Sequence, residues 1–153
     1  MRFFREDHRK LKQTLAKLTE SQIVNDIIMG DWSVKDVIAH ISAWNLEITR
    51  SIDEVLQKKA PWYLTKGETA FNMAEVEKRH DWSLQEVLDE WENSFDSLTH
   101  RIEEITAEEW NIDTGLIWAD GSAVTMESLF GYRYRGEGHE GGHALQIREY
   151  YNL

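Results

Sequence analysis

Residues 83–105, SLQEVLDEWENSFDSLTHRIEEI, decide the fold of this chain. Apolar side chains recur there in alternating steps of four and three, which places them in one narrow stripe along an α-helix. The stripe consists of Leu84, Leu88, Trp91, Phe95, Leu98, Ile102 and Ile105. A stripe of this width packs against matching stripes on other helices. The segment therefore predicts one long helix of a helical bundle.

Three other segments carry helical patterns. Apolar residues have helical spacing in about 3–18 and 33–59, and less regularly in about 125–151. Pro61 is the single proline of the chain, so long helices are not interrupted. We predict an all-α fold, a four-helix bundle with a long crossover connection between helices 2 and 3, formed by one domain spanning residues 1–153.

Hydroxyl residues followed three positions later by an acid mark the predicted helix starts. These pairs are Ser33 with Asp36, Ser83 with Glu86, and Thr106 with Glu109. In such a capping box the hydroxyl accepts from the amide three residues on, and the acid accepts from the cap's own amide. Between the long helices we expect a short helical turn over 20–28, a short helix within 69–80 of the 60–82 connection, and an irregular segment over 111–124.

Composition excludes several classes of function. The 153 residues include 17 basic and 28 acidic side chains, which gives a net charge of −11. An acidic chain without a basic stripe repels phosphate backbones, so we expect no nucleic-acid binding. No apolar run approaches the roughly 20 residues that span a bilayer, and the charged N-terminus does not resemble a signal peptide. The absence of cysteine excludes thiolate ligands and disulfides. We expect a cytoplasmic protein that does not enter a membrane.

Two of the six histidines have a spacing typical of metal ligands. His139 and His143 lie four apart in GHEGGHALQI, residues 138–147, so a helix would present both imidazoles on one face. They would share one divalent ion, or they would be two solvated or hydrogen-bonded histidines. His40 is the first candidate for a third ligand, and His8, on the stripe of the first helix, competes with it.

Two histidines show no such relation. His80 falls at a helix end and His100 falls off the stripe of the third helix, so we interpret both as surface residues.

The last helical segment is unusually rich in glycine. Gly131, Gly136, Gly138, Gly141 and Gly142 lie within twelve positions, although glycine inside a helix costs about 1 kcal/mol relative to alanine. In one interpretation the glycines make room where another helix or a ligand approaches closely. In the other they mark a break in the helix.

The segment WSVKDVIAHISAWN, residues 32–45, resembles the second-helix signature of the DinB-like (DNA-damage-inducible) four-helix-bundle superfamily. The matching positions are Trp32, Ser33, Lys35, Asp36 and His40. HEGGHALQI is similar to the fourth-helix pattern of the same superfamily. The resemblance covers nearly the whole chain and implies a metal site made of His40, His139 and His143. Such a site would hold one divalent metal ion per chain, with zinc or nickel preferred by three imidazoles.

The resemblance also implies a range of functions. Members act as metal-dependent hydrolases, isomerases or thiol-dependent transferases on small molecules, some with a low-molecular-weight thiol such as bacillithiol or mycothiol. The chain is also similar to the ClbS/DfsB-like branch, whose small bundles protect against reactive small molecules, and there a metal would be incidental. A third alternative is a structural bundle that forms a homodimer. Whether the chain is an enzyme is left open, and so are its catalytic residues.

Several residues are candidates for supporting roles. Asp36 would orient His40 or, in our preferred interpretation, belong only to the helix cap. The other polar candidates are Asn45, Glu47, Glu137 and Glu140. Aromatic residues would line a pocket beside the ion or, taken singly, belong to the core; they are Trp44, Trp62, Tyr63, Phe71, Trp91 and Tyr134.

Overall fold

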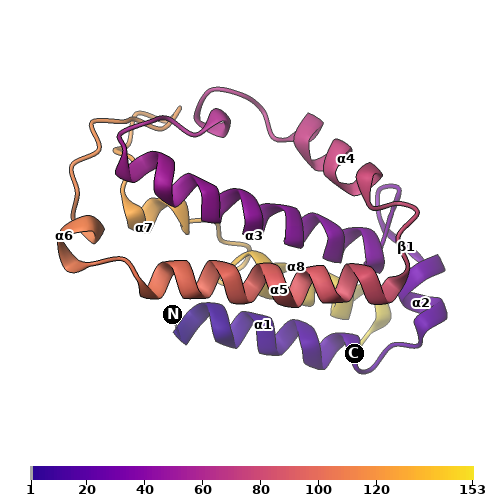
Figure 1. Ribbon diagram of the computed structural model, residues 1–153. Helices are drawn as coiled ribbons and strands as arrows, with labels where there is room; N and C mark the ends of the chain where they lie inside the picture. Colours follow the sequence, from indigo (N-terminus) through magenta and orange to yellow (C-terminus); the bar gives the residue numbers. More distant parts are fainter. Residues whose placement is uncertain (1) are drawn as a thin grey trace.

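Four long helices form the body of the protein, which a computed structural model describes over residues 2–153. They are α1 (Arg2–Leu15), α3 (Val34–Leu56), α5 (Leu84–Glu103) and α8 (His139–Tyr151). α3 packs most extensively on α5, and α1 packs on α8 (Figure 1). The predicted all-α bundle is confirmed.

The crossover connection is required by the direction of the helices. Lys35 Nζ donates to the carbonyl oxygens of His80 and Trp82 near the starts of α3 and α5, at 2.8 Å each. Arg101 donates to Asp53 near their ends. The two helices therefore run parallel, and the chain must return along the bundle between them. The return contains the single turn η1 (Trp62–Leu64) and the predicted short helix α4 (Thr69–Lys78), which packs on α3 (Figure 1).

The three predicted capping boxes are present at the starts of their helices. Ser33 and Ser83 each accept from the amide three residues on, while Asp36 and Glu86 accept from the cap amides. Thr106 caps α6 (Ala107–Trp110) in the same way. A further box at Thr19, not identified in the sequence, starts α2 (Glu20–Asn25).

The expected helical turn over 20–28 is too long. α2 ends at Asn25, and β1 (Ile27–Met29) pairs antiparallel with β2 (Trp32–Ser33). Gly30 lies between the strands with φ +57°, a conformation that glycine adopts without a Cβ penalty. The β-branched pair Ile27 and Ile28 favours the extended backbone before this turn.

The expected single helix over 125–151 is wrong. The structure has α7 (Met126–Leu129), then an irregular segment over 130–138, then α8. Arg135 and Gly136 have φ values of +50° and +88°, which no right-handed helix contains. Their turn is closed by two backbone hydrogen bonds between Tyr134 and Glu137. The helix break therefore lies just before the histidine pair and leaves the pair inside α8.

The core has two apolar clusters joined by α3. One contains Val34, Val37, Ile38 and Ile41 of α3, and the other contains Ile52 and Val55. Between them α3 buries the polar residues Ser42, Asn45 and Ser51. Of these, Asn45 donates to Glu140 of α8 beside the candidate site, whereas Ser42 and Ser51 donate to carbonyl oxygens of α3 itself.

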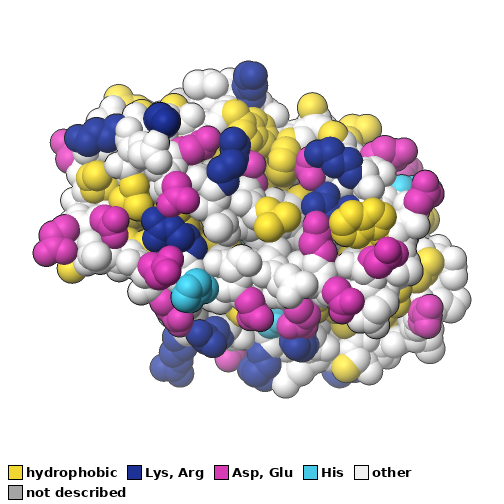
Figure 2. Space-filling view, viewed as in Figure 1, with side chains coloured by type: hydrophobic (Ala, Val, Ile, Leu, Met, Phe, Trp, Pro, Cys, Tyr) yellow, Lys and Arg dark blue, Asp and Glu magenta, His cyan; other side chains and the backbone are white. Residues whose placement is uncertain are grey.

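The surface carries mixed charge. Acidic and basic side chains are mixed over the face in Figure 2, and basic side chains gather along its lower edge, over α1. No helix within residues 2–153 is both long and apolar enough to cross a bilayer.

Candidate metal centre

Three imidazoles converge where α3 faces the first turns of α8. His40 comes from α3, and His139 and His143 come from α8. The Nε2 atom of His139 lies 3.0 Å from that of His40 and 3.2 Å from that of His143. One ligand atom from each side chain lies within 4.8 Å of the others. The structure therefore brings together the three histidines that the resemblance implied.

Burial keeps these imidazoles neutral. It lowers the pKa of His40 to about 3, with a further contribution from His143, and lowers the pKa of His143 to about 4. The pKa of His139 is also lowered well below its usual value, first by burial and then by the two neighbouring imidazoles. Neutral imidazole is the form that binds a metal ion.

The donor set fits a divalent cation. Zinc–nitrogen bonds of 2.0–2.1 Å in a tetrahedral shell place the ligand atoms about 3.3 Å apart, which agrees with the Nε2 separations of 3.0 and 3.2 Å. With a cation between them all three Nε2 atoms can be unprotonated at these separations, whereas without one each close pair needs a proton on one of its nitrogens as a hydrogen-bond donor. Three protein ligands would also leave a coordination position for water or substrate, as in catalytic zinc sites.

The orientation of His143 is set by one hydrogen bond. Its Nδ1 donates to Gln146 Oε1 at 2.8 Å, because an amide oxygen can only accept, and Nε2 is left unprotonated on the side of the cluster. Asp36 does not orient His40: its Oδ2 accepts from the amide and the hydroxyl of Ser33, at 2.9 and 2.7 Å. The cap interpretation of Asp36 is correct.

The remaining histidines lie apart from the cluster. His8, the competing third ligand, is stacked on Phe95 and contacts Glu140 and Glu92 through its two nitrogens, at 2.8 and 3.3 Å. His80 and His100 are exposed, as the sequence predicts. His40 is therefore the third member of the cluster.

Glu140 joins α8 to the other three long helices. It is only 6% exposed, although it lies between the two histidines of α8 in sequence. Its Oε1 accepts from Trp91 of α5 at 3.1 Å and from Asn45 of α3 at 3.2 Å, and its Oε2 accepts from His8 of α1 at 2.8 Å. This carboxylate holds the start of α8 in place against the bundle.

A cavity of about 820 Å³ adjoins the imidazoles. Of the six aromatic residues expected to line a pocket, Trp44 and Tyr63 do so. Trp91 is core, and Tyr134 packs against Gly142. Several aromatic residues of the wall were not identified from the sequence: Phe3, Phe4, Trp118, Phe130 and Tyr132. They come from distant segments with no common spacing, so no sequence pattern could have grouped them.

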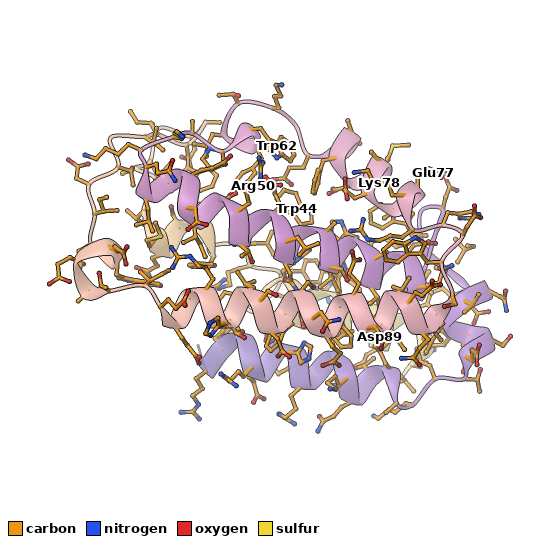
Figure 3. The ribbon with its side chains drawn as sticks, in the orientation of Figure 1. Trp44, Arg50, Trp62, Glu77, Lys78 and Asp89 are labelled. Atoms are coloured by element: carbon orange, nitrogen blue, oxygen red, sulfur yellow. The ribbon has the colours of Figure 1, made fainter. Side chains whose placement is uncertain are left out.

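Trp62 and Phe71 support the cavity wall from behind. The ring centroid of Trp62 lies 6.2 Å from that of Trp44, and the ring centroid of Phe71 lies 5.0 Å from each of these two. Trp62 Nε1 and Arg50 both donate to Glu47 Oε1, at 2.7 and 2.6 Å, where the connection runs beside α3 (Figure 3). Glu47 is thus occupied by structural contacts. Glu137 is likewise occupied by an ion pair with Lys10.

Comparison with known proteins places the chain in a family. Residues 4–127 match the family described as mycothiol maleylpyruvate isomerase N-terminal domain. The chain belongs to this family. It is thereby part of the DinB-like helical superfamily that the sequence resembles. The match contains His40, whereas His139 and His143 lie beyond its end.

Solved structures show the same fold at low identity. A mycothiol-dependent maleylpyruvate isomerase is similar with a TM-score of 0.71 and 13% identity, over 95% of this family member and 57% of the isomerase. The chain thus spans little more than half of that enzyme. An uncharacterised protein from Escherichia coli UTI89 is similar with a TM-score of 0.74 and 14% identity, over 97% of this chain and 88% of the other. No curated protein matches the chain significantly.

Proposed function

We propose that the protein binds one divalent ion, zinc or nickel, through His40, His139 and His143. We further propose that it uses the ion in thiol-dependent chemistry on a small molecule bound in the cavity. The observation that carries this proposal is the convergence of three neutral Nε2 atoms beside a cavity of about 820 Å³. A structural ion would instead be enclosed by four protein ligands.

The thiol part of the proposal is supported by the family. The family model and a structural relative are both described as mycothiol-dependent or mycothiol-related isomerases. This chain has no cysteine, so a reacting thiol would have to come from a cosubstrate. When bound, a divalent ion stabilises a thiolate or polarises a carbonyl oxygen.

The chain's own residues would bind and orient the reactants. Gln146 holds His143 with its Nε2 toward the cluster, and Glu140 anchors the helix that carries two of the three imidazoles. The walls contributed by Phe4, Trp118 and Phe130 exclude water around an apolar group. We assign no general base: of the polar candidates named from the sequence, Glu47 and Glu140 are both engaged in structural hydrogen bonds.

Elemental analysis of protein purified without an affinity tag tests the metal. We expect about one zinc or nickel ion per chain, and its loss in the His40→Ala, His139→Ala and His143→Ala variants. His80→Ala and His100→Ala are matched controls, because both side chains are exposed, and should keep the ion. Wild-type protein that stays metal-free after incubation with both ions would refute the proposal.

A second candidate function is small-molecule binding without catalysis, as in the ClbS/DfsB-like branch. The aromatic wall of the cavity favours it. Metal-loaded and chelator-treated protein should be compared in binding an apolar fluorescent probe and in turning over thiol cosubstrates. Thiol-dependent turnover that requires the ion supports the proposed chemistry. Probe binding that survives metal removal, together with no turnover, supports the second candidate.

A further inference from the structure

The helix that carries His139 and His143 begins without a cap of its own. Its N-cap residue is Gly138, which has no side chain to accept from the first amides of α8. Asp7 of α1 supplies an acceptor for the N-cap amide itself: its Oδ2 accepts from the Gly138 N–H at 2.9 Å, as the acid of a capping box accepts from its N-cap amide. Asp7 is 3% exposed, so this carboxylate is enclosed by the two helices that it joins.

Two glycines of α8 make room for this carboxylate. A Cβ atom built on Gly141 would lie 2.5 Å from Asp7 Oδ1, and one built on Gly138 would lie 2.6 Å from Asp7 Oδ2. Real Cβ atoms do not approach oxygen so closely, so any larger residue would displace the carboxylate. The glycine-rich segment is therefore explained in part by the approach of Asp7, and in part by the turn at Gly136.

The position of this contact bears on the imidazoles. His139 directly follows Gly138, and its Nε2 must lie within about 3 Å of His40 Nε2 on another helix. The first turn of a helix frays when its amides lack acceptors. Fraying here would move His139 away from His40, while His143, one turn further in, would be less affected.

We propose that Asp7 is a positioning residue for the metal centre: its carboxylate, supplied from α1, fixes the first turn of α8 and thereby holds His139 against His40. The inference rests on the proposed metal site. Asp7 touches neither the ion nor a ligand ring in this scheme. Gly138 and Gly141 are required for the same contact, because only glycine at both positions leaves room for the Asp7 carboxylate.

Cobalt titration of metal-free protein tests this inference. We expect Asp7→Ala to weaken cobalt binding on the order of tenfold, the usual effect of losing a helix cap or an outer-shell partner. The visible absorption of the bound cobalt should also change as the ligand geometry changes. Asp7→Asn keeps an oxygen acceptor and should restore binding to within about twofold of the wild type.

Gly141→Ala is the most specific test variant, because it disturbs the contact and leaves Asp7 itself unchanged. We expect it to weaken cobalt binding as much as Asp7→Ala does, and the double variant to be no weaker than either single variant. Leu11→Val, which trims a fully buried side chain one turn along α1, is the control. It should lower stability and leave cobalt binding unchanged.

Amide hydrogen exchange of the metal-free proteins measures the protection of the Gly138 amide directly. The Gly138 amide should exchange faster in Asp7→Ala and Gly141→Ala than in the wild type or in Leu11→Val. Wild-type cobalt affinity and spectrum in both Asp7→Ala and Gly141→Ala would overturn the inference, and so would additive losses in the double variant. A wild type that binds no cobalt would instead refute the proposed metal site, while the exchange measurement would still report on the cap.

Discussion

Trp91 on α5 donates its indole N–H to Glu140 on α8 across 3.1 Å of buried interior. The same carboxylate also accepts from Asn45 and His8, so three helices direct polar groups at one side chain. A buried carboxylate is tolerated only when its lone pairs are satisfied in this way. Glu140 thus secures the helix that carries two of the three clustered histidines.

Removing this carboxylate should be costly. Glu140→Ala leaves Trp91 Nε1, Asn45 and His8 without their shared acceptor, and we expect the free energy of unfolding to fall by about 3 kcal/mol or more. Urea denaturation measures the loss. Glu92→Gln is the control, since Glu92 contacts His8 from a half-exposed position and should change stability by less than about 1 kcal/mol. A Glu140→Ala loss as small as that of the control would contradict the anchoring role.

The pH dependence of metal binding should follow the buried pKa values. Free histidine would lose its ligand character near pH 6.5, but burial lowers the pKa of His143 to about 4 and that of His40 to about 3. Protons therefore do not compete with the ion until the pH falls below about 5. Cobalt affinity should be flat between about pH 8 and 5 and fall below that range.

Proton release on metal binding is an independent test of whether the buried histidines are neutral. Neutral imidazoles release almost no protons on binding the ion, so calorimetry at neutral pH in buffers of different ionisation enthalpy should give the same binding enthalpy. A midpoint near pH 6.5, with measurable proton release just above it, would show that the cluster is solvated instead of buried.

Ionisation of Asp7 should lower the stability of the fold as the pH rises. Burial, opposed by the hydrogen bond from Gly138, raises the pKa of this carboxyl from 3.8 to about 6. A carboxyl whose folded pKa is raised contributes stability that is complete below about pH 4 and is lost as the pH rises through about 6. Asp7→Asn does not ionise, so relative to the wild type it should gain on the order of 2 kcal/mol between about pH 4 and 7.

Urea denaturation of both proteins at several pH values measures this difference, and titration of the histidines cancels in the comparison. Asp96→Asn is the control, because Asp96 is exposed on α5. A wild-type to Asp7→Asn difference that does not change with pH would show that Asp7 keeps an ordinary pKa in the folded protein.

Local patterns predicted the helices because each depends on near neighbours. The stripe of residues 84–105 and the boxes at Ser33, Ser83 and Thr106 need only three- and four-residue spacings. The break before α8 was only one of two interpretations of the glycines, because apolar residues on both sides suggested one periodicity. The positive φ of Arg135, a residue that rarely adopts that conformation, has no sequence signal.

The three clustered histidines of the candidate site were predicted, and their surroundings were not. His139 and His143 have a local spacing, and His40 followed from the family resemblance. Asp7 and Glu140 could not be assigned, because their partners are about 130 and 95 residues away in sequence. An acid on the first helix and an acid between two histidines are solvated in most proteins, and only the packed structure shows that both are buried.

His8 and His40 give the most direct test of the proposed centre, because both are buried histidines on long helices. His40→Ala should lose the ion, since two ligands make a poor site. His8→Ala should keep about one ion per chain and yet lose about 1.5–3 kcal/mol of unfolding free energy, because Glu140 would lose a buried partner. Elemental analysis and urea denaturation of the same two samples measure both effects. A metal-free His8→Ala beside a metal-loaded His40→Ala would mean that the ion is held between α1 and α8, and the proposed centre would be wrong.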